Sequence, residues 1–140
     1  MTREEFSKML RDARVGRGFS GVNVWQKSGL SCGQVQYIEQ GKNNYGLKNV
    51  LRYLSALELS LVLKTPQHRL IVRDNADIVS FFRNERESKS ITRSKLAELS
   101  NMSEGTLSDI EQQQTKFHID PFLAVASALG VEVGICPIGE

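Results

Sequence analysis

Residues 28–41 read SGLSCGQVQYIEQG, and residues 100–113 repeat their pattern as SNMSEGTLSDIEQQ. An offset of 72 residues aligns the two stretches without a gap, and the same register extends over residues 10–63 against 82–135. A repeat of this length indicates a duplicated structural unit. The sequence therefore predicts a tandem duplication, marked by these identical pairs: Arg11 with Arg83, Arg14 with Arg86, Ser31 with Ser103, Gly33 with Gly105, Ile38 with Ile110, Glu39 with Glu111, Leu51 with Leu123 and Ala56 with Ala128.

Two helices are predicted at the start of each copy. Residues 3–15 and 76–87 carry apolar side chains three or four positions apart, which is the spacing of one buried helix face. Asn75 is expected to be the N-cap of the helix at 76–87. Ser20 and Thr92 predict the N-caps of the second helices, because hydroxyl side chains satisfy the free amides of a first turn.

A sharp corner and a third helix follow in each copy. Gly29 and Asn101 occupy equivalent positions, and both residue types readily accept a left-handed backbone. Ser31 and Ser103 are the expected N-caps of the third helix. Its inward residues are Val35 and Ile38 in the first copy and Leu107 and Ile110 in the second. The opposite face of this helix is therefore free to project.

A fourth helix is predicted from a broad apolar stripe, after which the periodicity changes. The stripe comprises Leu47, Val50, Leu51, Leu54 and Leu57 in the first copy and Ile119, Phe122, Leu123, Ala126 and Leu129 in the second. Residues 59–63 and 131–135 then alternate with a period of two, as strands do. Because a lone strand leaves its backbone unpaired, we expect the two to pair with each other. Residues 70–72 are either linker or a further strand.

Composition is that of a globular protein, with 40% hydrophobic and 24% charged residues among 140. No apolar run approaches the roughly 20 residues that span a bilayer, and the first residues show no signal-peptide pattern, so a cytoplasmic location is expected. Cys32 and Cys136 have no metal-ligand spacing and are expected to be free thiols. We expect no cofactor and no metal.

The two halves differ in charge. Residues 1–72 contain 11 Lys and Arg against 5 Asp and Glu, a net charge of +6, whereas residues 73–140 contain 7 against 11, a net charge of −4. Such asymmetry predicts that the first copy meets an anion and that the second has another partner or a structural role.

Both copies resemble the helix-turn-helix domains of the lambda-repressor/Cro type, called the XRE family. The resemblance rests on Thr92, Leu96 and Ala97 of the second helix, on the turn, and on the Ile-Glu pair at 38–39 and 110–111. The first copy is similar to HipB-type antitoxins through GFSGVNVWQKSGLS at 18–31 and LSALELSLVLK at 54–64. In that group the strand pairs between two subunits of a DNA-binding dimer, whereas here the duplication supplies both strands.

The resemblance implies a mainly α fold of two tandem lambda-repressor-like domains, at 1–64 and 76–140, with residues 65–75 as linker. Each domain ends in a short strand, and the strands pair in a small antiparallel sheet. Such a chain is a monomer with pseudo-twofold symmetry or a homodimer. The resemblance also implies an ion pair of Arg14 with Glu39 and of Arg86 with Glu111, which holds the third helix against the first.

A third helix of this type lies in the major groove, and neighbouring loops contact phosphates. The DNA-binding residues that the resemblance implies are Ser31, Cys32, Gly33, Gln34, Gln36, Tyr37, Lys42, Asn43 and Asn44 in the first copy, with Arg93, Thr106 and Ser108 in the second. Glutamine can read adenine bidentately.

The second copy also presents Glu104 and Asp109, whose charges oppose the phosphate field. The first copy departs from the family with Gly21 at the position of Arg93, and with Trp25 where a small residue packs between helices, so its helix pair is expected to be splayed. We expect the first copy to be the better DNA reader.

The function expected from these features is sequence-specific binding of double-stranded DNA by a transcriptional repressor. The main alternative is an antitoxin-like module that binds a toxin or another protein through the acidic second copy. A redox sensor at Cys32 is a further alternative, because a nearby helix N-terminus can lower a thiol pKa. An enzyme is not expected, since His68 and His118 are isolated and no phosphate-binding glycine loop follows a strand.

Overall fold

The computed structural model describes residues 1–113 and 115–139, and within them the chain is mainly helical with one small sheet. The first half contains α1 (Arg3–Gly16), α2 (Gly21–Ser28), α3 (Cys32–Gln40), α4 (Leu47–Ala56), β1 (Leu59–Lys64) and β2 (Arg69–Ile71). The second half contains α5 (Asn75–Ser88), α6 (Arg93–Leu99), α7 (Glu104–Glu111), α8 (Ile119–Leu129) and β3 (Glu132–Pro137). Within the described ranges, no helix is long and apolar enough to cross a membrane.

The predicted N-caps are present except at α5, and α4 and α8 begin without a side-chain cap from their own N-cap residue. Thr2 opens α1 with a capping box that sequence reasoning did not identify. The N-cap of α5 is Asp74 and not Asn75, because the Asp74 carboxylate accepts the Asp77 amide at 3.0 Å. Asn75 is consequently the first residue of α5, and its side chain does not cap the helix.

The sheet has the order β2-β1-β3 and is antiparallel throughout. The predicted pairing of the two alternating stretches is present, since β1 pairs with β3 from Leu59 opposite Pro137 to Lys64 opposite Glu132. β3 begins at Glu132, one residue later than predicted, and extends to Pro137. The segment left open by the sequence forms β2, a third strand in a hairpin with β1.

Strand alternation predicts the burial of β1 better than that of β3. Leu59, Leu61 and Leu63 face the core and are buried. Alternation would place Val62 and Cys136 on the face opposite to these leucines and to Val133 and Ile135, yet only 7% and 8% of their surfaces are exposed. Val62 is in the central strand, where β2 and β3 flank it on both sides.

One hydrophobic core extends through both halves of the chain. Phe122 of α8 lies edge-on to Phe6 of α1, with ring centroids 6.5 Å apart, and it also contacts Phe82 and Phe117 at 5.7 and 6.0 Å. Phe6 and Phe122 have no exposed surface. The halves are therefore joined by aromatic packing as well as by the sheet.

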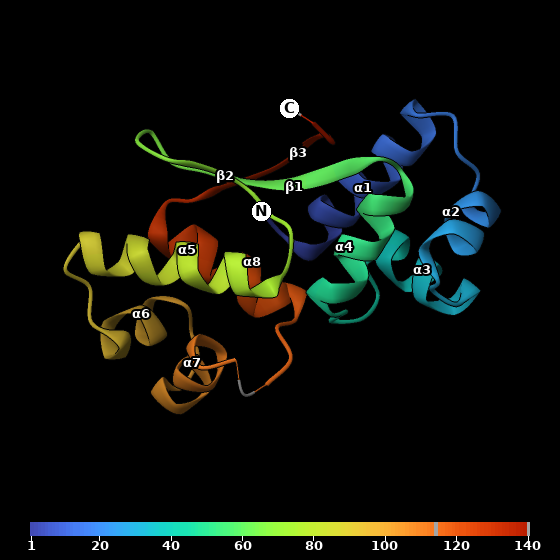
Figure 1. Cartoon of the computed structure of the whole chain (residues 1–140). Coiled ribbons are helices and arrows are strands. Elements are labelled where there is room, and N and C mark those ends of the chain that lie inside the picture. The colour runs from blue at the N-terminus through green and yellow to red at the C-terminus, as the bar shows by residue number, and fades with distance from the viewer. Residues whose placement is uncertain (114, 140) are drawn as a thin grey trace.

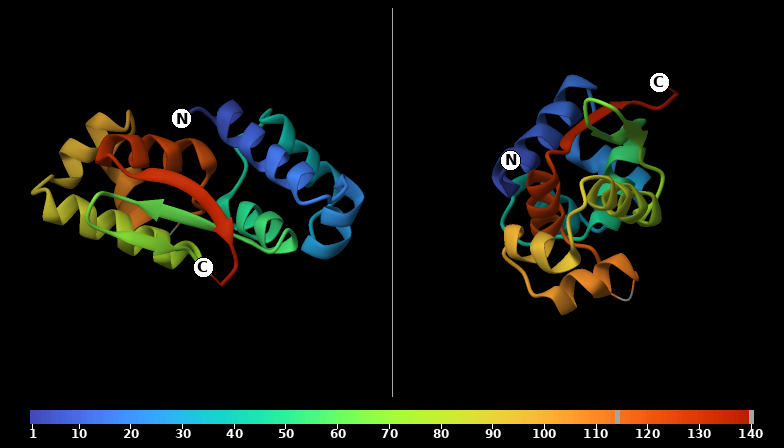
Figure 2. Two further views of the ribbon diagram at one scale, coloured as in Figure 1. Left: turned by 90° about the horizontal axis from the view of Figure 1, so that it is seen from above. Right: turned by 90° about the vertical axis from the view of Figure 1, so that its left-hand side faces the viewer.

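Two backbone contacts between the halves are centred on positions 72 residues apart. The loops before α4 and α8 bridge at Gly46 and His118, where the Leu47 amide donates to Phe117 at 2.9 Å and the Ile119 amide donates to Tyr45 at 2.8 Å. The β1–β3 ladder has Val62 opposite Gly134. Figures 1 and 2 show α2 and α3 at one end of the molecule and α6 and α7 at the other, with α4 and α8 between them.

Candidate nucleic-acid interface

Each half contains a pair of short helices joined by a tight left-handed corner. Gly29 ends α2 with φ of 76°, and Asn101 follows α6 with φ of 57°. Both positions thus adopt the backbone predicted from their residue types. Ser31 and Ser103 cap the next helix, because their hydroxyls accept the amides of Gln34 and Thr106 at 3.1 and 3.0 Å. The corner and the cap together set the direction of α3 and α7.

The outward face of α3 is exposed along its length. Val35 and Ile38 are buried as predicted, and the helix presents Cys32, Gln36 and Tyr37 to solvent. Tyr37 has 47% of its surface exposed, so its ring is accessible to a ligand. Gln36 donates weakly to the Cys32 sulfur at 3.8 Å, so its amide oxygen stays available as an acceptor.

Two of the predicted base-reading residues are also engaged inside the helix. The Gln34 side-chain oxygen accepts the Ser31 amide at 2.9 Å and completes a capping box. Reading adenine bidentately with Gln34 would require opening that bond. Ser31 is likewise engaged as the cap, which makes both residues positioning groups for the start of α3.

The loop after α3 contains the three residues that were predicted to contact the DNA backbone. Lys42, Asn43 and Asn44 are all exposed, and Asn44 is also used structurally. The Asn44 side-chain oxygen accepts the Asp120 amide at 2.9 Å and so caps α8 of the other half. Because His118 makes no side-chain cap there, the contact from Asn44 replaces it. A Cβ added at Gly33 would meet the Ser31 hydroxyl at 3.9 Å, an ordinary contact, so the glycine is not required by the packing inside the chain.

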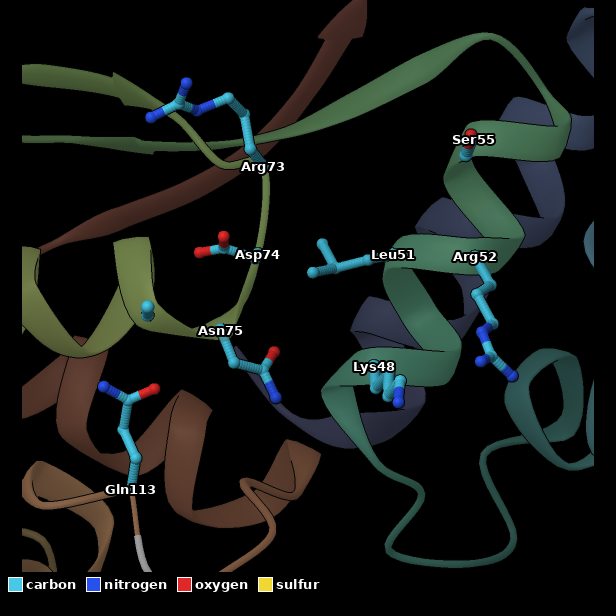
Figure 3. Close-up of a pocket in the computed structure, with 9 residues that line it drawn as sticks. Lys48, Leu51, Arg52, Ser55, Arg73, Asp74, Asn75 and Gln113 are labelled. Atoms are coloured by element: carbon cyan, nitrogen blue, oxygen red, sulfur yellow. The ribbon is translucent and has the colours of Figure 1, made fainter.

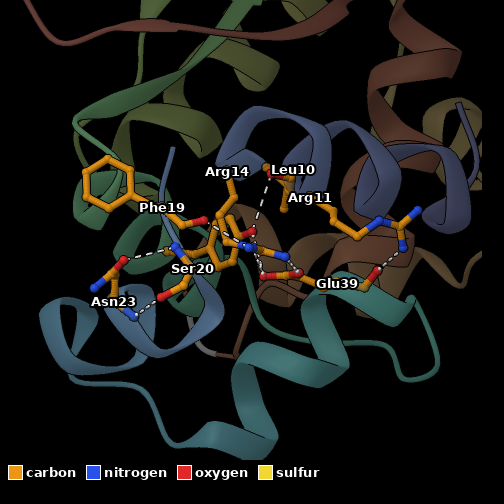
Figure 4. Close-up of polar contacts among 8 residues, drawn as sticks. Leu10, Arg11, Arg14, Phe19, Ser20, Asn23 and Glu39 are labelled. Atoms are coloured by element: carbon orange, nitrogen blue, oxygen red, sulfur yellow. Dashed lines mark hydrogen bonds and ion pairs between the residues drawn. The ribbon is translucent and has the colours of Figure 1, made fainter. Parts of the chain in front are cut away.

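An arginine fork anchors α3 to α1, as Figure 4 shows. Arg14 donates from Nε and Nη2 to the two carboxylate oxygens of Glu39, both at 2.9 Å, and from Nη1 to the Phe19 carbonyl. Hydrogen bonding to Glu39 raises the pKa of Arg14, so this guanidinium stays charged at physiological pH. The Tyr53 hydroxyl donates to the same carboxylate at 2.9 Å. Burial, with the nearby Glu39 charge, raises the pKa of Tyr53.

The equivalent pair in the second half is more deeply buried. Arg86 donates from Nε to Glu111 at 2.8 Å and from Nη1 to the Ile91 carbonyl at 3.1 Å. The exposed fractions of the two side chains are 10% for Arg86 and 5% for Glu111. In each half, one arginine of the first helix, α1 or α5, therefore makes two contacts. It binds the glutamate near the end of α3 or α7, and it donates to a carbonyl in the loop before α2 or α6.

Arg93 makes a contact that sequence reasoning missed. Its Nε lies 2.7 Å from the second carboxylate oxygen of Glu111, a contact of charges without hydrogen-bond alignment. In each half a second side chain thus contacts the glutamate of the ion pair: Tyr53 contacts Glu39, and Arg93 contacts Glu111. The two are not equivalent in the repeat, because position 125 is a valine and position 21 is a glycine. The hydroxyl of Tyr53, on an otherwise apolar helix face, was the sequence feature that could have predicted the contact with Glu39. The Arg93 side chain stays 45% exposed, which leaves part of its guanidinium accessible.

The outward face of α7 is polar and acidic. Glu104, Gly105, Thr106 and Asp109 are exposed. The Thr106 hydroxyl lies 2.8 Å from the Ser103 hydroxyl, and Ser108 is half-buried and accepts from Gln112 at 3.2 Å. Two of the predicted second-copy contacts are therefore partly satisfied within their own helix.

Trp25, which occupies the position of a small residue in the family, is partly exposed. The residue keeps 44% of its surface exposed, while the neighbouring Val24 is fully buried. At the equivalent site in the second half, Ala97 is 3% exposed. Trp25 therefore adds exposed apolar surface to α2, and the splaying of this helix pair stays a prediction.

Comparison with known proteins gives one family match. The helix-turn-helix family model matches residues 82–135, which hold the second half of α5 together with α6, α7, α8 and the first four residues of β3. These residues are thus similar to a helix-turn-helix domain, and this similarity suggests a DNA-binding transcription regulator. No curated protein and no solved structure matches the chain. The matched range is the one that the 72-residue offset aligns with residues 10–63.

Proposed function

We propose that this protein is a sequence-specific DNA-binding repressor that reads the major groove with α3, and more weakly with α7. The carrying observation is the exposed outer face of α3, held rigid by the Arg14–Glu39 fork and a capping box. A recognition helix must keep its angle while phosphate contacts set the register of the protein. The match of residues 82–135 to a helix-turn-helix family supports the same class of function.

We further propose that one chain is a pseudo-dimer with two recognition helices. Both backbone contacts between the halves are centred on pairs 72 residues apart, Gly46 with His118 and Val62 with Gly134. Two copies related by a twofold axis make their mutual contacts at equivalent residues, so these centres support the tandem duplication. In this proposal a single chain binds two DNA half-sites, one with each recognition helix, without a second subunit.

The two recognition helices are proposed to do unequal work. The first half carries a net charge of +6 and exposes uncharged hydrogen-bonding side chains on α3. The second half carries −4 and exposes Glu104 and Asp109 on α7. Because phosphates repel carboxylates, α7 is the weaker reader in this proposal.

Alanine substitutions on α3 are expected to weaken specific binding. Replacing Gln36 or Tyr37 should cost about 1 to 3 kcal/mol of binding free energy, the usual value of a good base contact. The equivalent changes at Ser108 and Asp109 should cost less. The measurement is a fluorescence-anisotropy titration on a duplex selected from random sequences, at one fixed salt concentration because counterion release makes the affinity salt-dependent.

Equal losses from both helices would contradict unequal reading and leave DNA binding intact. Replacing Glu104 and Asp109 together by Gln and Asn serves as a second control, since removing two repelling charges should tighten non-specific binding. If selection enriches no motif and no duplex binds at low salt, the repressor proposal fails. The acidic face of α7 would then favour the antitoxin-like module that binds a protein.

A further inference from the structure

A cleft of about 560 Å³ opens between α4 and the start of α5, where the two halves meet. Its walls include Lys48, Leu51, Arg52 and Ser55 from α4, and Asp74 and Asn75 from the start of α5. Figure 3 shows Leu51 pointing from α4 across the cleft toward Asp74 and Asn75, with Lys48 one turn below it. The cleft thus has an apolar centre and cationic groups on its α4 side.

Lys48 and Arg52 are four residues apart on α4 and have no acidic partner. Among the described residues, no carboxylate lies within 4 Å of either side chain. Like charges at this spacing on a helix repel and destabilise it slightly. An anion bound beside them would remove that repulsion.

The α5 side of the cleft supplies an unsatisfied polar group. Asp74 is used as the helix cap, and Asp77 is paired with Arg73. The side-chain oxygen of Asn75 is buried, and within the described part of the chain it has no hydrogen-bond partner. Because this oxygen is closed to solvent, the Asn75 side chain must rotate before it can accept from a ligand hydroxyl or present its N–H groups to an oxyanion in the cleft.

The equivalent cleft on the other side of the molecule, of about 330 Å³, contains an ion pair of its own. It is lined by Arg3 and Asp120, and the Arg3 Nη1 donates to the Asp120 carboxylate at 2.7 Å. The 72-residue offset puts Asn75 at the position of Arg3 and Lys48 at that of Asp120, while Arg52 replaces Ala124. The internal ion pair is therefore absent on the α4–α5 side, where two cationic side chains of α4 replace Asp120 and Ala124, and the one carboxylate among the described lining residues, that of Asp74, caps α5.

We infer that the α4–α5 cleft binds a phosphate-bearing molecule. Lysine offers a point charge and arginine a planar fork, and both residue types bind phosphate oxygens. The Leu51 side chain offers apolar contact to the rest of such a ligand. The phosphate belongs either to a free small molecule or to the backbone of bound DNA.

Inorganic pyrophosphate is the probe, titrated at constant ionic strength while backbone amide signals are recorded by NMR. Saturable shifts are expected in residues 48–55 and 74–76. The double variant Lys48→Asp with Asn75→Arg copies the Arg3–Asp120 pair into the cleft, and should weaken pyrophosphate binding by about tenfold or more. Lys8→Ala is the matched control, because it lowers the net charge by the same one unit at an exposed site of α1 and should leave binding unchanged.

A second titration, with duplex DNA already bound, distinguishes the two sources of phosphate. If pyrophosphate shifts persist on the DNA complex, the ligand is a free small molecule. If DNA displaces pyrophosphate and the double variant also binds DNA less tightly, the cleft holds a backbone phosphate. Absence of saturable shifts, or equal binding by wild type and the double variant, would overturn the inference. Neither of those results depends on DNA, so they do not test the repressor proposal.

Discussion

Replacing Glu111 by glutamine should lower the free energy of unfolding by about 3 to 5 kcal/mol, the usual cost of leaving one member of a buried ion pair alone. Glu111 and Arg86 are 5% and 10% exposed, and Arg93 contacts the same carboxylate. Glutamine preserves the shape but removes the charge, so Arg86 stays buried beside a neutral amide. Urea denaturation followed by circular dichroism measures the change.

The control for Glu111→Gln is Asp12→Asn, which removes a carboxylate from the exposed Lys8–Asp12 pair. Lys8 lowers the pKa of Asp12 through a hydrogen bond, yet water screens the pair, so the urea midpoint should not move. If Glu111→Gln changed the midpoint as little as Asp12→Asn, the buried ion pair would not anchor α7 as described.

Truncation of Phe122 to alanine should cost about 3 to 5 kcal/mol, as large-to-small changes of buried aromatic residues do. The ring has no exposed surface and contacts Phe6, Phe82 and Phe117. Because these contacts join α8 to α1 of the first half, the loss should appear in one cooperative transition of the whole chain. Differential scanning calorimetry, compared with urea denaturation, measures both the size and the cooperativity.

Leu99→Ala is the matched control for Phe122→Ala, since Leu99 is also apolar but 51% exposed on α6. It should change stability by less than about 1 kcal/mol, because surface changes have small effects. Two separate transitions in wild type or in Phe122→Ala would show that the halves unfold independently, which contradicts a shared core.

Local features of the fold were predictable from the sequence because they depend on neighbouring residues. The left-handed corners at Gly29 and Asn101, and the caps at Ser31 and Ser103, follow from residue type and spacing. The pairing of β1 with β3 was predictable because an isolated strand needs a partner and the chain offers two. The repeat register then located both arginine–glutamate pairs.

Contacts that depend on the packing of distant segments were not predictable. Asn44 caps a helix 76 positions away in the chain, and Arg93 turns back onto Glu111. Both side chains were expected at phosphates from their position in one repeat alone. The α5 cap moved to Asp74 because two adjacent residues both have good capping side chains, and backbone direction decides between them.

The most direct test of the two-helix proposal is the stoichiometry of the DNA complex. Sedimentation of the protein with one selected operator duplex should give one chain per duplex, and hydroxyl-radical footprinting should protect two major-groove segments about 34 Å apart. The shared core and the β1–β3 ladder place both recognition helices in a single chain. Two chains per duplex, with one recognition helix of each in contact with DNA, would contradict the pseudo-dimer.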